Sequence, residues 1–204
     1  MSKFFAKKHF HINREMEKNI HQVLDPGGHI NGQGRFPVQD MRFGNVNAGF
    51  ASCEVIAVYN VLKDLDRFVP FAELIYMNER SGYMLAGGLF GTGTAKISAL
   101  LDAYGIQHRK LKRREFTEKI EKNEIPDGSI FIVTIRTRKT LPVSVLHTFE
   151  MRRSRGKWIV YNRFNNSESA GIYDSTADIL MNGSHRGEWY CIYEIAGGNT
   201  YQAI

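Results

Sequence analysis

The stretch from Asn45 to Arg67, NVNAGFASCEVIAVYNVLKDLDR, decides the predicted fold. Ser52 is a residue type that commonly precedes a helix, and apolar residues follow at positions 55–59, 61, 62 and 65. These positions cover more than one face of a helix, and a helix that is apolar on several faces is buried. The stretch therefore predicts a helix over residues 53–66 in the middle of the domain, with Cys53 in its first turn.

The rest of the chain divides into a helical first half and a strand-rich second half. Periodicity and turn residues predict further helices over residues 13–24, 71–80, 94–104, 114–122 and 175–181, and strands over 107–111, 129–137, 143–151, 157–163 and 188–196. Helices first and mostly antiparallel strands later predict a single α+β domain over residues 1–204. We expect an N-terminal extension over 1–40, a helical half over 41–105 and a sheet half over 106–204.

Composition narrows the class of protein. The 204 residues are 43% hydrophobic and 24% charged, which is typical of a chain with a folded core. Only Cys53 and Cys191 are present, so a disulfide framework of the secreted kind is excluded. No apolar run is long enough for a signal peptide or a membrane span, so we expect a cytoplasmic protein without a membrane partner.

Cys53 is the first candidate for catalysis. A thiol in the first turn of a helix lies near the positive end of the helix dipole, which favours the nucleophilic thiolate and predicts a lowered pKa. Asn47 lies six residues earlier, where its amide could stabilise an oxyanion formed above the sulfur. The alternative is that Cys53 is a small buried apolar residue. Cys191, on one predicted strand face with Trp189 and Tyr193, is expected to be a packed core thiol.

A cysteine nucleophile needs a base, and His147 is the candidate. In VSVLHTFEM, strand alternation places its imidazole on one face with Phe149 and Met151. The alternative is a histidine that only fills the core. The other six histidines occupy sequence contexts typical of the surface: His9, His11, His21, His29, His108 and His185.

Asn162 is the candidate for orienting that base. The strand that contains it follows a turn, and a two-residue loop at residues 154–155 or at 155–156 keeps Asn162 on the same face as His147. We therefore predict that Asn162 holds the imidazole through a ring N–H. The alternative is an ordinary asparagine at the end of a strand.

Three segments resemble a known family: NAGFASCEVIAVYNVL, FAELIYMNERSGYMLAGGLFGTGTAKISALLDAYG and VLHTF. From about Met41 to Asn165 the chain is similar to small stand-alone bacterial cysteine peptidases of the papain-like superfamily, related to the peptidases that cleave double-glycine bacteriocin leaders. The resemblance implies a papain-like fold in which Cys53 is the nucleophile, His147 the base, Asn162 its orienting residue and Asn47 the oxyanion donor.

This resemblance implies hydrolysis of a peptide or amide bond through an acyl-enzyme, with a peptide or protein substrate and no cofactor. Amidase or acyl-transfer chemistry by the same residues remains open. Two other classes also remain open: a catalytically inert papain-like protein that binds peptides, and a basic nucleic-acid-binding module.

Other motifs carry less weight. The net charge of +6 and the basic clusters at residues 108–115, 136–139 and 152–157 could contact phosphates, but lysine and arginine also protect sheet edges, and we expect no nucleic-acid partner. The glycine-rich stretch GGLFGTGTAKIS lacks the spacing of a phosphate-binding loop. We expect no metal site, because no histidine or cysteine pair has the spacing of a zinc motif.

Overall fold

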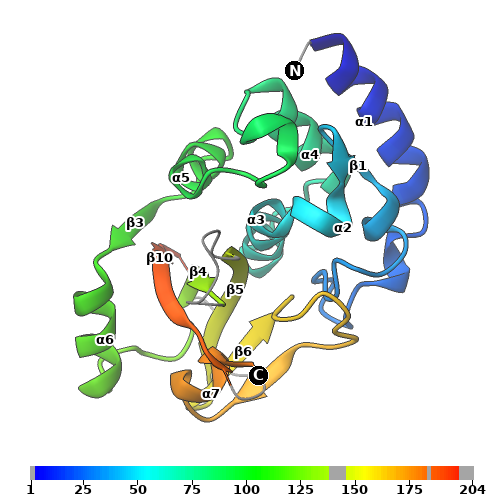
Figure 1. Ribbon diagram of the computed structural model, residues 1–204. Coiled ribbons are helices and arrows are strands. Elements are labelled where there is room, and N and C mark those ends of the chain that lie inside the picture. The colour runs from blue at the N-terminus through cyan, green and yellow to red at the C-terminus, as the bar shows by residue number, and fades with distance from the viewer. Residues whose placement is uncertain (1–2, 138–145, 183–184, 198–204) are drawn as a thin grey trace.

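A helical layer and a sheet meet along one central helix (Figure 1). The computed structural model describes residues 3–137, 146–182 and 185–197. The helices are α1 (Lys3–Glu17), α2 (Ala48–Ala51), α3 (Cys53–Asp64), α4 (Phe71–Arg80), α5 (Thr94–Ala103), α6 (Arg113–Glu121) and α7 (Thr176–Leu180), with three short 3-10 turns, η1 (Ile20–Gln22), η2 (Val38–Asp40) and η3 (Ala86–Gly88). The α+β class predicted from the sequence is confirmed.

The sheet is antiparallel throughout, in the order β3-β10-β4-β5-β6-β7. Its strands are β3 (His108–Leu111), β10 (Glu188–Ile195), β4 (Ile130–Arg136), β5 (Leu146–Ser154), β6 (Lys157–Tyr161) and β7 (Gly171–Tyr173). Two small ribbons pair β1 (Arg42–Phe43) with β2 (Val46–Asn47), and β8 (Met181–Asn182) with β9 (His185–Arg186).

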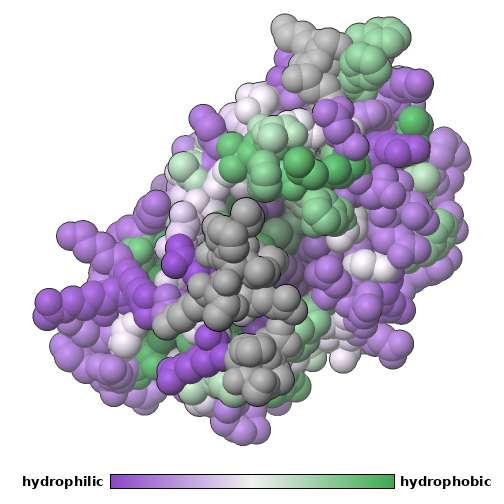
Figure 2. Space-filling model, in the orientation of Figure 1, coloured by the Kyte–Doolittle hydropathy of each residue, from purple (hydrophilic) through white to green (hydrophobic). Residues whose placement is uncertain are grey.

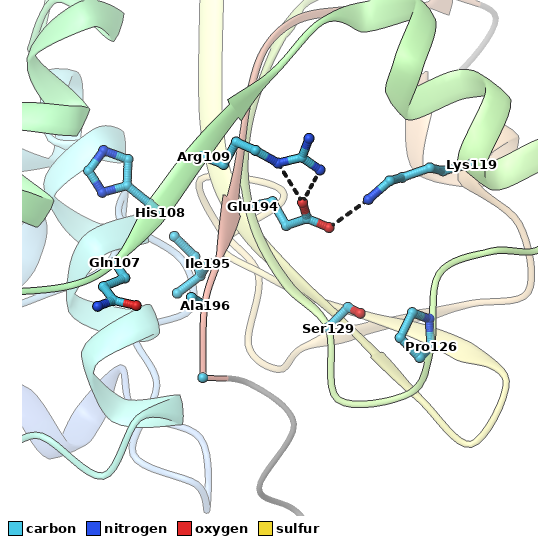
Figure 3. Close-up of a pocket in the computed structure, with 10 residues that line it drawn as sticks. Gln107, His108, Arg109, Lys119, Pro126, Ser129, Glu194, Ile195 and Ala196 are labelled. Atoms are coloured by element: carbon cyan, nitrogen blue, oxygen red, sulfur yellow. Dashed lines mark hydrogen bonds and ion pairs between the residues drawn. The ribbon is translucent and has the colours of Figure 1, made fainter.

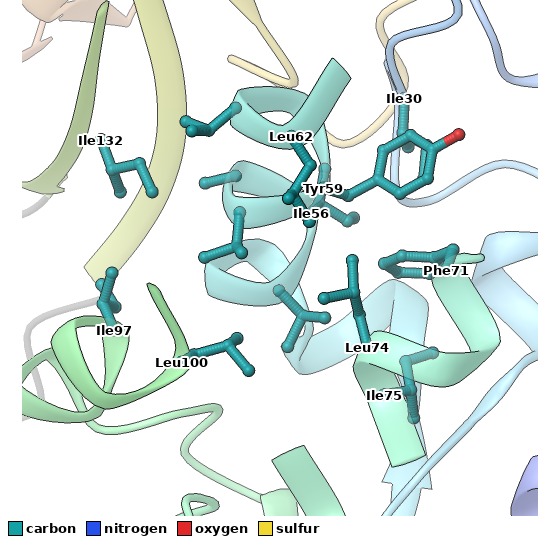
Figure 4. Packing of buried hydrophobic residues seen from close by; sticks show 14 of the residues in the cluster. Ile30, Ile56, Tyr59, Leu62, Phe71, Leu74, Ile75, Ile97, Leu100 and Ile132 are labelled. Carbon is teal, nitrogen blue, oxygen red and sulfur yellow. The ribbon is translucent and has the colours of Figure 1, made fainter. Parts of the chain in front are cut away.

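Two apolar clusters form the core. The first surrounds α3, whose apolar residues pack between α4, α5 and strand β4 (Figure 4). The second contains large aromatic residues from the sheet and α6: Phe116, Phe131, Phe149, Trp158 and Trp189. Because strand side chains alternate, each cluster takes one face of the sheet. The predicted burial of α3 is confirmed, since all but one of its residues are buried.

Two predicted elements have other bounds in the described structure. The first helix covers Lys3–Glu17 rather than residues 13–24, because its buried positions include Ala6 and Asn13, which give little apolar periodicity. Asn13 instead bonds both main-chain polar groups of Arg42. Strand β5 begins at Leu146, and the predicted residues 143–145 lie outside the described part of the chain.

A bulge in β10 separates residues that the sequence placed together. The pairing with β4 shifts by one residue between Trp189 and Cys191. Cys191 and Tyr193 therefore join the first cluster, whereas Trp189 joins the second. Cys191 is a packed core thiol as predicted, but the predicted common face with Trp189 is wrong, because a bulge reverses the alternation.

Candidate functional site

Cys53 begins α3 and lies against the sheet. Its side chain is buried, and the backbone and hydroxyl of Thr148, on β5, are its neighbours there. Burial raises the pKa of the Cys53 thiol well above its ordinary value, and the neighbouring Glu54 carboxylate raises it further. Hydrogen bonds with the backbone and hydroxyl of Thr148 lower the pKa of the thiol, but by less than burial and Glu54 raise it. The predicted lowering of the thiol pKa is therefore wrong, because loss of hydration outweighs the helix dipole.

Glu54 is a second buried acid at the same helix start. Burial raises its pKa to about 7, although the backbone N–H of Thr92 donates to its carboxylate at 3.4 Å. The loop containing Thr92 packs closely over the helix: a side chain at Gly91 would come within 3.0 Å of the Glu54 carboxylate and 3.1 Å of the Ala51 carbonyl. Gly91 and Thr92 thus cover the helix start, and we call the loop that contains them, residues 84–92, the roof.

His147 is held by a main-chain group. Its Nε2 lies 2.7 Å from the carbonyl oxygen of Asn162. A carbonyl only accepts hydrogen bonds, so Nε2 carries the proton and Nδ1 keeps its lone pair in the neutral ring. Burial and the nearby Arg163 cation together lower the pKa of His147 to about 4, although hydrogen bonds with the backbone of Asn162 and Arg163 act in the opposite direction. At neutral pH the ring is therefore uncharged.

Cys53 lies against β5, the strand that contains His147, but on the opposite face from the imidazole. Thr148 is the residue beside the thiol, and His147 precedes it directly. Successive strand residues point to opposite faces, and the Thr148 hydroxyl bonds Thr134 across the strands. His147 instead shares a face with Phe149, whose ring centre is 6.0 Å away. In the described structure the thiol and the imidazole share no hydrogen bond, so the pair stays a prediction.

Asn162 contacts His147, but not through its side chain. The β5–β6 loop is Arg155-Gly156, with Ser154 opposite Lys157, and β6 ends at Tyr161. Asn162 then adopts a positive φ of 55°, which turns its carbonyl toward the imidazole. Its side-chain amide bonds Gln33 instead. Asn162 therefore lies beside His147, as the hairpin register predicts, but the atom that contacts the imidazole is a backbone oxygen, and the orienting role stays a prediction.

Asn47, the predicted oxyanion donor, lies at the junction of β2 and α2. Its side-chain oxygen accepts a hydrogen bond from Arg42 at 3.4 Å. Nothing in its described contacts ties the amide to the thiol, so this role also stays a prediction.

A buried ionic cluster at the other end of α3 was missed. His29 is 4% exposed, and its ring bonds Asp25 at 3.2 Å and Asp64 at 2.7 Å. Arg152 contacts the same Asp64 oxygen at 2.7 Å. The predicted surface position of His29 is therefore wrong. Asp25, four residues before His29, was the one local signal, since Asp64 is distant in sequence.

A pocket of 640 Å³ lies apart from this site, between β3, β10 and the loop after α6 (Figure 3). Two cations border it, but the Glu194 carboxylate binds both, Arg109 at 2.7 Å and Lys119 at 2.9 Å. Arg109 also binds the Glu115 carboxylate at 2.7 Å, so the two cations are balanced by two carboxylates, and no residue of the predicted site lines the pocket.

Comparisons with known proteins give no family. Neither the scan of protein-family models nor the search of curated proteins finds a match to this chain. Within the described residues, no group of three or more histidine, cysteine or acidic side chains is arranged to bind a metal. The same residues contain no helix with the length and apolarity needed to cross a membrane.

Proposed function

We propose that this protein is a papain-like cysteine peptidase that uses Cys53 as its nucleophile and His147 as its base. One observation carries the proposal: a thiol at a helix start packs against β5 beside the residue that follows His147, and that imidazole has Nε2–H engaged and Nδ1 available. A nucleophile, a neutral base and a group that fixes the tautomer of the base are the parts that thiol hydrolysis needs.

The chemistry follows from the two protonation states. The raised thiol pKa and the lowered imidazole pKa mean that the resting pair is neutral, so His147 Nδ1 must take the thiol proton as sulfur attacks the carbonyl carbon. The imidazolium then returns that proton to the leaving amine as the C–N bond breaks, which leaves a thioester. Nδ1 then deprotonates a water molecule, which attacks the thioester carbonyl. The C–S bond breaks, the carboxylic acid product leaves, and the imidazolium returns the proton to the Cys53 sulfur. This requires the imidazole to approach the sulfur when substrate is bound.

Exposed apolar side chains around the helix start support a peptide as substrate. Phe50 lies three residues before Cys53 and is 67% exposed, and Leu85, Leu89 and Phe90 in the roof are also exposed. Figure 2 shows apolar surface over α2 and the roof. Apolar patches of this kind commonly mark a binding surface. A bulky apolar side chain of the substrate, next to the scissile bond, would cover this patch.

A second candidate is an inert relative that only binds peptides. The 7% exposure of Cys53, its raised pKa and the position of His147 on the other face of β5 favour this candidate. It shares the apolar surface with the peptidase, so only the reactivity of Cys53 separates the two.

The test is labelling of Cys53 by a peptide electrophile with phenylalanine at its reactive end. A Cys191→Ser background leaves Cys53 as the one thiol, and mass spectrometry of the intact protein measures the rate. A peptidase should react at least tenfold faster with the peptide reagent than with iodoacetamide, and His147→Gln should abolish that advantage. Equal slow rates in both proteins would establish the inert candidate instead.

A further inference from the structure

Gln33 and Asn162 form a buried pair that joins two loops far apart in sequence. The backbone N–H of Gln33 donates to the Asn162 side-chain oxygen at 3.0 Å, and the Asn162 amide donates to Gln33 Oε1 at 3.0 Å. Both residues are almost wholly buried. Two hydrogen bonds with complementary donors and acceptors fix the orientation of both amides.

Asn31 adds a third contact to the same residue. Its side-chain oxygen accepts from the backbone N–H of Asn162 at 3.0 Å. Asn162 is thus held at its backbone N–H and at both ends of its amide, in a conformation with φ of 55° that few residues adopt freely. The only strong polar group it has left is its carbonyl, and that oxygen faces His147.

Gln33 also reaches the segment before the nucleophile. Its Nε2 donates to the carbonyl of Gly49 at 3.1 Å, in α2 and four residues ahead of Cys53. The approach is close, because a side chain at Gly49 would come within 2.9 Å of the Gln33 carbonyl. One glutamine therefore contacts the segment that holds the base and the segment that leads to the thiol.

We propose that Gln33 is a positioning residue for His147: by fixing Asn162, it aims the Asn162 carbonyl at Nε2 and so selects the tautomer with a basic Nδ1. This inference rests on the proposed function for its catalytic meaning, but the tautomer can be measured without any activity. Asn31 also holds Asn162, and we call Gln33 and Asn31 together the clamp. The hydrogen bond from Gln33 to Gly49 fixes the position of the clamp relative to α2.

The experiment uses nitrogen-15 NMR of the histidine rings in the full chain. The His147 signals are assigned by their loss in His147→Gln. The wild-type protein should show His147 as one tautomer, with the proton on Nε2. In Gln33→Met, which keeps side-chain length but removes both side-chain hydrogen bonds, the signals should become a mixture of tautomers. Gln39→Met is the matched control at an exposed glutamine of the same segment, and it should change nothing.

Two results would overturn the inference: an Nδ1–H tautomer in the wild-type protein, or an unchanged single Nε2–H tautomer in a folded Gln33→Met variant. The first of these results overturns the inference even if Gln33→Met does not fold. Asn31→Ala provides a second route to loosening Asn162.

Labelling of Cys53 separates this inference from the proposed function. If the clamp positions a working base, Gln33→Met should lower the rate with the peptide electrophile by about tenfold, and Gln39→Met should not. If the tautomer responds to Gln33→Met but Cys53 labelling ignores both Gln33 and His147, then the clamp stands and the peptidase proposal fails.

Discussion

At the scale of single residues, Glu54 makes the folded state depend on pH. Its pKa of about 7 in the folded protein exceeds the ordinary glutamate value of 4.5, so the folded state binds the proton more tightly than the unfolded state. The resulting stabilisation is complete below pH 4.5 and is lost as pH rises through 7, a change of about 3 kcal/mol. We expect Glu54→Gln to remove this loss, so that it stabilises the protein at pH 8 but not at pH 4.5.

Thermal unfolding of both proteins between pH 4.5 and 8 checks this prediction. The difference between them is the quantity to follow, because Glu17, Glu79 and Glu150 also have raised pKa values and contribute the same trend to both. Parallel curves for the two proteins would show that folding does not raise the pKa of Glu54.

Asn162 provides a prediction that reverses the usual order of glycine and alanine. Both substitutions remove two side-chain hydrogen bonds with Gln33, and both variants must keep the positive φ, but only alanine has a Cβ that makes this conformation costly. We expect Asn162→Gly to be more stable than Asn162→Ala by about 1 kcal/mol, and both to be less stable than the wild type. Urea unfolding measures the order, and a more stable alanine variant would contradict the left-handed backbone.

At the scale of elements, the β5–β6 hairpin contains a loop that is not optimal. Arg155 has φ of 51° and Gly156 has φ of 74°, and this pair of positive values is what a two-residue type I′ turn requires. Arginine is disfavoured there, whereas asparagine is favoured. Arg155→Asn should therefore raise the unfolding free energy by about 0.5–1 kcal/mol. Chemical denaturation checks it, with the exposed Lys157→Asn as a control that should not stabilise.

Elements with strong local signals were predicted well, and those set by distant contacts were not. Helix α4 has its predicted bounds, because Pro70 precedes an amphipathic stretch that ends at Arg80. The face of Trp189 could not be predicted, because the bulge in β10 depends on pairing with β4. The same limit applies to the site: Asn162 was placed beside His147 by counting along a hairpin, but its partner Gln33 is 129 residues away.

At the scale of the whole molecule, Asp64 ties three segments together. Its carboxylate binds His29 of the N-terminal segment and Arg152 of β5 from the end of α3. We expect Asp64→Asn to lower the unfolding free energy by about 2 kcal/mol, because two charge-assisted hydrogen bonds lose their anion. The matched control is Asp66→Asn, at an exposed position where asparagine tolerates the φ of 53°. Equal effects on urea unfolding would show that the cluster contributes no net stability.

The strand order affects how this protein folds during its synthesis. Strand β10 lies inside the sheet, between β3 and β4, although it is made last of the three. During synthesis, the edges of β3 and β4 that pair with β10 therefore stay unpaired until residues 188–195 emerge from the ribosome. Unpaired strand edges can pair with other chains. The helices around α3 can pack together early, but the sheet cannot be completed before synthesis reaches Ile195. A nascent chain stalled before Ile195 should therefore bind chaperones more strongly than a chain stalled after Ile195.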